Sequence, residues 1–159
     1  MFKQIDKKIF YSPIDGKIAS IKSDVESSFF GKKQYCLEIF ISPFNCGGVY
    51  LPFSGEVEKL MMDRGRKTFA LRQHPTTGYL LIIKGEHNQK CGLLLPKGML
   101  PRWPKLWIMP EDRGGVGAYI GHIFPGERIF LYMSASYEIL VKKGDKISAG
   151  ATFLGKINE

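Results

Sequence analysis

Few side chains in this sequence combine a reactive type with a spacing that catalysis requires. The chain has three histidines, which are His74, His87 and His122. None of them forms an H-x-H or H-x-x-x-H pair, so the sequence predicts no zinc site of that kind. Two acids stand in defined contexts: Glu127 directly follows Gly126, and Asp15 lies in a Ser-Pro-Ile-Asp-Gly corner. A carboxylate can serve as acid, base or nucleophile, but an aspartate at such a corner is more often a turn residue that hydrogen-bonds its own backbone.

The cysteines and the charge balance narrow the classes of partner. Cys36, Cys46 and Cys91 are odd in number and lack C-x-x-C spacing, so we expect buried free thiols rather than disulfides or a metal site. With 23 Lys and Arg against 15 Asp and Glu, the net charge is +8. This charge favours anionic partners, such as acidic lipid headgroups or nucleic acid. Nothing beyond the charge supports binding to nucleic acid. The alternative is that the basic side chains are simply solvated and bind no partner.

The elements that must position these residues are expected to be short strands in a single domain, residues 1–159. Eighteen glycines and nine prolines, spread along 159 residues, favour strands joined by tight turns, so we expect an all-β fold. The corner at Ser12–Ile18 returns at Leu51–Val57 with the shared pattern P-x-[DS]-G-[KE]-[IV]. This repeat predicts a duplicated β-unit. It looks like the barrel-sandwich hybrid (duplicated hybrid motif) architecture, an antiparallel β-sandwich with short strands.

Strands are expected where apolar residues run between turn residues. Gly117–Gly155 reads as strand, turn, strand, turn, strand, and the polar stretch Lys22–Lys33 is expected to be a loop. The other expected strands lie within Ile9–Ile21, Tyr35–Ile41, Lys67–Leu71, Tyr79–Ile83 and Cys91–Leu95.

A proline-rich segment, Gly98–Pro110, is a second candidate for function. Its three prolines exclude a regular helix. Trp103 and Trp107 alternate there with Arg102 and Lys105, as in a loop at a membrane interface whose rings lie at headgroup depth and whose cations face phosphates. The alternatives are an apolar flap over the sandwich and a contact with a second copy of the chain in a homo-oligomer.

Two stretches of the chain resemble the phosphatidylserine decarboxylase family. Gly121–Tyr132 reads GHIFPGERIFLY, beside the family's processing-site pattern G-x-I-x-x-G-S-R-v-x-x-Y. Ser42–Val57 reads SPFNCGGVYLPFSGEV, beside the short members' S-P-F-N-x-H-x-N-R-x-P-x-S-G-x-V. With the Asp15 corner, the resemblance covers the chain from about Ile9 to Leu60 and from about Gly115 to the end.

The resemblance implies a site that has lost most of the family's chemistry. The family's serine attacks the preceding peptide bond and becomes a pyruvoyl group, whereas this chain has Glu127 there, so no pyruvoyl is expected, nor any metal. The family's histidine falls on Gly47, and the second histidine of longer members falls on Tyr50. We therefore assign no catalytic residue. The expected vestigial pocket comprises Asp15, Asn45, Gly47, Tyr50, Gly126 and Glu127.

The function implied by this resemblance is that of a phosphatidylserine decarboxylase-like pseudoenzyme that binds a phospholipid, a membrane surface or a partner. One alternative is an active decarboxylase or lyase that uses a non-standard site with Asp15, Glu127 or Tyr50. Decarboxylation needs an electron sink, which no side chain supplies well. The other alternative is a lipoyl-type carrier or adaptor domain.

The sequence also predicts where the protein is located and which substitutions would restore self-cleavage. The start MFKQIDKKIF lacks a signal-peptide core, and no apolar run of about 18 residues occurs, so a cytoplasmic, membrane-peripheral protein is expected. Glu127→Ser alone is expected to leave the chain uncut, and Glu127→Ser with Gly47→His is expected to restore some cleavage.

Overall fold

The computed structural model of the protein describes residues 8–27, 31–63, 78–86, 89–96, 103–124, 126 and 128–157. This described part contains strands and no helix, which confirms the all-β prediction. The strands are β1 (Ile9–Tyr11), β2 (Gly16–Ser27), β3 (Gly31–Phe40), β4 (Gly48–Tyr50), β5 (Gly55–Asp63), β6 (Gly78–Gly85), β7 (Lys90–Pro96), β8 (Lys105–Leu106), β9 (Arg113–Gly114), β10 (Tyr119–His122), β11 (Arg128–Ser134), β12 (Tyr137–Ile139), β13 (Lys146–Ile147) and β14 (Phe153–Ile157).

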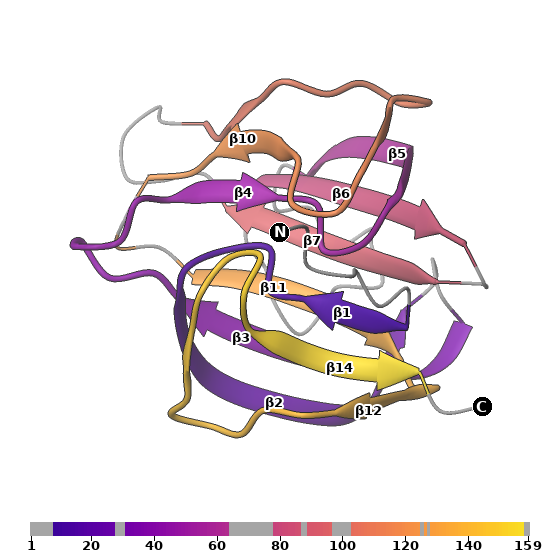
Figure 1. Ribbon diagram of the computed structural model, residues 1–159, viewed down its shortest axis with the longest axis vertical. Helices are drawn as coiled ribbons and strands as arrows, with labels where there is room; N and C mark the ends of the chain where they lie inside the picture. Colours follow the sequence, from indigo (N-terminus) through magenta and orange to yellow (C-terminus); the bar gives the residue numbers. More distant parts are fainter. Residues whose placement is uncertain are drawn as a thin grey trace, which may run out of the picture.

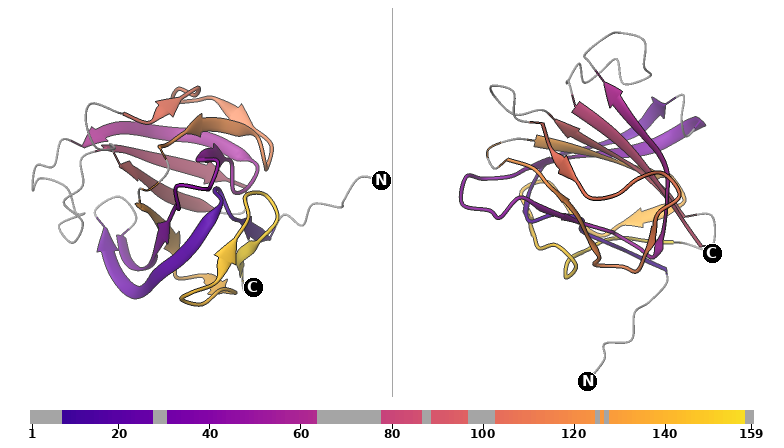
Figure 2. Two further views of the ribbon diagram at one scale, coloured as in Figure 1. Left: turned by 90° about the vertical axis from the view of Figure 1, so that its left-hand side faces the viewer. Right: turned by 90° about the horizontal axis from the view of Figure 1, so that it is seen from above.

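These strands form one large sheet and two small ones. The large sheet has the order β13-β2-β3-β11-β7-β6-β5-β9, and the small sheets have the orders β1-β14-β12 and β4-β10-β8. Both small sheets lie in front of the large sheet in Figure 1, one above the other, and the large sheet is strongly twisted (Figure 2). Phe10 and Val49 from the small sheets and Leu131 from the large one are fully buried in the shared core. The fold is therefore an antiparallel β-sandwich with open sheets.

The order of the large sheet is the same when it is followed inward from either end. A two-residue strand comes first (β13 or β9), then a strand that follows a corner (β2 or β5), its hairpin partner (β3 or β6) and a central strand (β11 or β7). Leu93 and Leu131 face each other at the middle of the central pair. The sheet thus has the internal duplication that the repeated corner predicted.

Hydrogen bonds at the two corners recur in the same places. Asp15 Oδ1 accepts the N–H of Ala149 at 2.7 Å, and Ser54 Oγ accepts the N–H of Val116 at 3.1 Å. Each corner also accepts a backbone hydrogen bond from the strand of the other half: Tyr11 N–H donates to the Pro52 carbonyl, and Tyr50 N–H donates to that of Pro13. The Asp15-Gly16 and Ser54-Gly55 corners therefore occupy related positions, as predicted.

The chain passes between the two halves at two crossovers, residues 41–47 and the link from β10 to β11, and the described residues 123, 124 and 126 of the second lie beside the first. Ile123 N–H donates to the Gly47 carbonyl at 2.9 Å, and Gly126 N–H donates to the Ile41 carbonyl at 2.6 Å. The two stretches that carry the family resemblance, far apart in sequence, are thereby joined at one edge of the sandwich.

Strand predictions from the sequence are confirmed for Tyr35–Ile41, Tyr79–Ile83 and Cys91–Leu95, which coincide with β3, β6 and β7 to within a few residues. The predicted loop at Lys22–Lys33 is wrong, because β2 and β3 continue through most of it as a hairpin with register shifts. A polar composition does not prevent backbone pairing, and bulges absorb the irregular register. The predicted strand at Lys67–Leu71 lies outside the described residues.

Candidate functional site

The first crossover is shaped by a turn that its own side chains hold. Asn45 Oδ1 accepts the N–H of Ser42 at 2.9 Å, while Asn45 N–H donates to the Ser42 carbonyl at 3.0 Å. Ser42 Oγ accepts the N–H of Phe44 at 3.2 Å. Ser-Pro-x-Asn is a typical turn sequence, because proline presets the second position and short polar side chains bond nearby backbone. Asn45 therefore has a structural role in this turn.

A pocket of about 420 Å³ lies between this turn and the first corner. It contains two of the predicted site residues, Asp15 and Asn45, and Gly126 is close to it through its hydrogen bond to Ile41. Gly47 and Tyr50 are not part of its lining. The position of Glu127 lies outside the described residues. The polar and charged residues that line the pocket are Asp15, Lys17, Ser42, Asn45, Lys146 and Ser148.

Asp15 is half-buried at the rim of this pocket, and one of its oxygens is occupied by the hydrogen bond from the Ala149 N–H. That bond ties the corner before β2 to the turn between β13 and β14. The sequence favoured an aspartate that hydrogen-bonds its own corner, whereas the backbone partner found here is Ala149 of a turn distant in sequence.

Asp15→Ala is expected to lower the free energy of unfolding by about 1–2 kcal/mol, because it leaves the Ala149 N–H without its acceptor. Asp15→Asn keeps a carbonyl oxygen in that place and is expected to retain most of the stability. Urea denaturation of both variants measures the difference. Equal losses in the two variants would show that the negative charge, and not the acceptor, is what matters at this corner.

Gly47 lies in the buried part of the first crossover with φ +74°, in the left-handed region that favours glycine. A Cβ built there would collide with the carbonyl oxygen of Ile123. It would also lie 3.4 Å from Cε1 of His122. The backbone therefore has no room for the histidine that the family resemblance implies at this position, and another histidine lies beside it.

His122 comes from β10, is half-buried, and lies edge-to-face with Phe124 at a centroid distance of 6.4 Å. Sequence reasoning did not select it, because it belongs to no metal-binding pair. No signal in the sequence could have found it, because its place beside Gly47 results from the strand pairing of His122 with Gly48.

Tyr50 lies on the outer side of the small sheet β4-β10-β8, since its neighbour Val49 points into the core. Its ring is 5.4 Å from that of Tyr119, which is in turn 5.7 Å from the ring of Trp107. We call these three residues the aromatic patch. Tyr119 is 48% exposed and Trp107 is 58% exposed.

The two tryptophans of the proline-rich segment have different environments. Trp103 is half-buried with its ring 5.2 Å from that of Tyr79, whereas Trp107 belongs to the aromatic patch. Lys105 is exposed on β8, and Arg102 lies outside the described residues. Within the described part of the chain, no helix is long and apolar enough to cross a bilayer.

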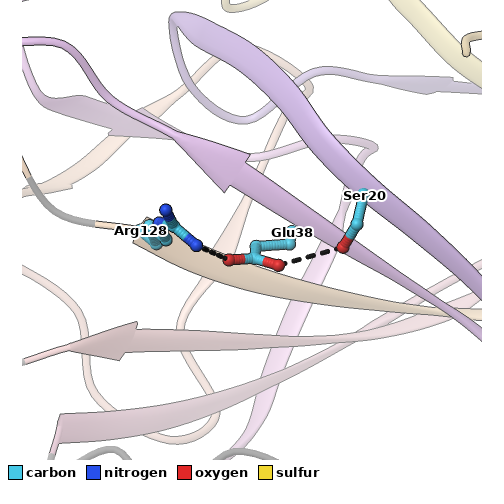
Figure 3. Close-up of polar contacts among 3 residues, drawn as sticks. All are labelled: Ser20, Glu38 and Arg128. Carbon is cyan, nitrogen blue, oxygen red and sulfur yellow. Dashed lines mark hydrogen bonds and ion pairs between the residues drawn. The ribbon is translucent and has the colours of Figure 1, made fainter. Parts of the chain in front are cut away.

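Arg128, which directly follows Glu127, is anchored on the large sheet. Its guanidinium donates to Glu38 Oε1 at 2.5 Å, and Ser20 Oγ donates to the other carboxylate oxygen at 2.9 Å (Figure 3). Charge-assisted contacts of this kind are the stronger hydrogen bonds in proteins. They fix the start of β11 against β3 and β2, next to the crossovers.

Two of the three cysteines are buried, and the described part of the chain holds no cluster of metal ligands. Cys36 and Cys91 are buried, as predicted, but Cys46 is exposed. Burial raises the pKa of the Cys36 thiol to about 11, so the nucleophilic thiolate is scarce at neutral pH. No group of three His, Cys, Asp or Glu side chains among the described residues could hold a metal ion.

Comparison with known proteins gives one consistent family. The model of the family described as phosphatidylserine decarboxylase matches residues 3–155. The phosphatidylserine decarboxylase proenzyme of Desulfotalea psychrophila is 28% identical over 96% of this chain and 72% of its own length. That of Syntrophus aciditrophicus is 26% identical over 94% and 71%, and that of Symbiobacterium thermophilum is 29% identical over 92% and 69%. No solved structure matches significantly.

Proposed function

Because the chain belongs to the phosphatidylserine decarboxylase family, we propose that it is a member that does not process itself and that binds an anionic phospholipid surface. The observation that carries the absence of self-processing is the residue after Gly126, which is Glu127 where the family's pattern has the self-cleaving serine. A glutamate has no oxygen on Cβ, so it cannot be converted to the dehydroalanine precursor of a pyruvoyl group.

The surrounding residues do not fit a pyruvoyl either. The relatives are proenzymes, whose pyruvoyl group arises by self-cleavage. At the position of the family's histidine, the left-handed backbone of Gly47 faces the Ile123 carbonyl and leaves no room for a Cβ. Of the family's acidic and basic groups, Asp15 is kept, and one of its oxygens is held by the backbone of Ala149. We therefore derive no reaction through this group.

The alternatives have less support. An enzyme with a non-standard site would use Asp15, Glu127 or Tyr50. Asp15 has one oxygen occupied by the Ala149 N–H, and the ring of Tyr50 belongs to the aromatic patch and not to the corner pocket. A lipoyl-type carrier needs its lysine at the tip of a hairpin. Lys17 and Lys59 are instead paired within β2 and β5, so neither offers that presentation.

The phospholipid part of the proposal is supported by the aromatic patch and its surroundings. Trp107 and Tyr119 are exposed, Met109 beside them is 70% exposed, and Lys105 is exposed on the adjoining strand. Amphipathic rings with cations nearby suit the headgroup region of a membrane, and the net charge of +8 favours an anionic one. The sequence predicted a contact made by Trp103 and Trp107. In the structure Trp103 packs on Tyr79, and Tyr50 and Tyr119 accompany Trp107 in the patch.

Purified protein is expected to be one chain that is not cut between Gly126 and Glu127 and has no carbonyl-reactive terminus. Intact mass spectrometry measures the chain, and a hydrazide probe that labels a pyruvoyl group measures the terminus. A phosphatidylserine decarboxylase that processes itself, carried through the same purification, is the positive control. Two fragments parting between Gly126 and Glu127, or labelling by the probe, would refute the proposal.

A further inference from the structure

The pocket at the first corner holds two lysines directly opposite each other. Lys17 on β2 and Lys146 on β13 are paired in register, so their side chains extend from the same face of the sheet, and both line the pocket. Both are exposed, and neither has an ion pair within the described part of the chain. Like charges that face each other across a strand pair are destabilising. Water and salt screen this repulsion between exposed side chains, and an anion bound between them would relieve it further.

The second corner provides an internal comparison. There, Glu56 on β5 and Arg113 on β9 occupy the positions that correspond to Lys17 and Lys146. They form an ion pair with Arg113 Nε 3.1 Å from Glu56 Oε2. A pocket of about 350 Å³ lies at this corner too, lined in part by both residues. The duplicated fold thus has one corner whose opposing charges neutralise each other and one whose opposing charges are both positive.

We propose that the pocket at the first corner binds a phosphate group between the ammonium groups of Lys17 and Lys146. Two point charges suit a phosphate, whose oxygens accept hydrogen bonds in several directions. Ser42, Asn45 and Ser148 add hydroxyl and amide groups to the lining. Asp15 is the acid in the lining, and its Oδ1 already accepts the Ala149 N–H.

The phosphate can belong to a lipid headgroup or to a soluble phosphate compound. The turn that lines the pocket also carries Phe44, which is 97% exposed. An exposed ring beside a phosphate pocket would enter a lipid surface while the pocket binds the headgroup. It would contribute nothing to the binding of a soluble phosphate.

The first experiment uses soluble ligands and does not depend on the proposed function. Inorganic phosphate and glycerol 3-phosphate are titrated into the full-length protein and followed by calorimetry and by thermal unfolding. We expect saturable binding and a rise in Tm with ligand concentration. Lys17→Glu recreates the charge pair of the second corner, so it is expected to weaken phosphate binding about tenfold or more and to raise the ligand-free Tm by roughly 1–4 °C.

The matched control is Lys143→Glu, which makes the same charge change on the neighbouring turn, outside the pocket lining. It is expected to leave the Kd within about twofold, because only long-range charge is altered. No saturable binding by the unmodified protein would overturn the proposal. So would equal weakening by Lys17→Glu and Lys143→Glu, which would reveal non-specific attraction to a basic surface.

The second experiment identifies the source of the phosphate. Phosphatidylcholine vesicles with and without phosphatidylglycerol are tested by co-sedimentation with Phe44→Ser and Lys17→Glu. If both variants lose vesicle binding while Phe44→Ser still binds glycerol 3-phosphate, the pocket takes a lipid headgroup. If vesicle binding is unchanged in both while Lys17→Glu loses glycerol 3-phosphate, the pocket takes a soluble phosphate. In that case the phosphate pocket stands even though its lipid role fails.

Discussion

Gly47→His is expected to lower the free energy of unfolding by about 3 kcal/mol or more, and not to supply a working histidine. The residue has φ +74°, which is costly for any side chain with a Cβ. The new Cβ would also meet the carbonyl oxygen of Ile123, the residue whose N–H donates the hydrogen bond to Gly47 that joins the crossovers. The sequence predicted that Glu127→Ser with Gly47→His restores some cleavage. We now expect no cleavage in this double variant, because Gly47→His disturbs the crossovers that would have to position the new serine. Urea denaturation measures the loss, and mass spectrometry of the double variant measures cleavage.

Gly117→Ala separates the two causes of this loss. Gly117 has φ +81°, but a Cβ there would have no neighbour within 4 Å. Its substitution is expected to cost only about 1 kcal/mol, from the backbone conformation alone. If Gly47→His costs no more than Gly117→Ala, the crossovers can move apart to accept a side chain. The family's histidine position would then be open in this protein.

The duplicated fold could be predicted because its signals are local. The pattern P-x-[DS]-G-[KE]-[IV] appears at both corners, and each instance contains the turn residues that its backbone needs. Tyr79–Ile83 and Cys91–Leu95 are apolar runs bounded by turns, which is why both were recognised as strands. Lys22–Lys33 was missed because pairing between backbones leaves little trace in a polar sequence.

The composition of the site could be predicted only in part. Asp15 and Asn45 belong to short motifs, and both are found at the corner pocket. Lys17 and Lys146 face each other because β13 pairs with β2, and these two strands come from opposite ends of the chain. His122 next to Gly47 likewise depends on the pairing of β10 with β4. Pairings between strands that lie so far apart in the sequence are set by the whole fold, and no spacing along one sequence reveals them.

Replacing Trp107 and Tyr119 together with alanine is expected to weaken binding to anionic vesicles about tenfold or more, because two exposed rings no longer bury apolar area. Lys105→Glu is expected to weaken it as well, and only this charge effect should fade at high salt. Flotation with vesicles of graded phosphatidylglycerol content, at low and high salt, measures both effects. Phe153→Ala is the matched control, since Phe153 is 47% exposed and packs on Tyr11 in the related small sheet, which has no tryptophan there.

Two results would contradict the membrane role of the aromatic patch. Unchanged flotation of the Trp107→Ala/Tyr119→Ala variant would show that the exposed rings take no part in binding. A protein that sediments as a dimer, and that becomes monomeric in this variant without ever binding vesicles, would show that the patch contacts a second copy of the chain. Salt distinguishes these roles further. An interface of exposed aromatic rings is stabilised mainly by apolar burial and should survive high salt, whereas attraction of Lys105 to an anionic membrane should not.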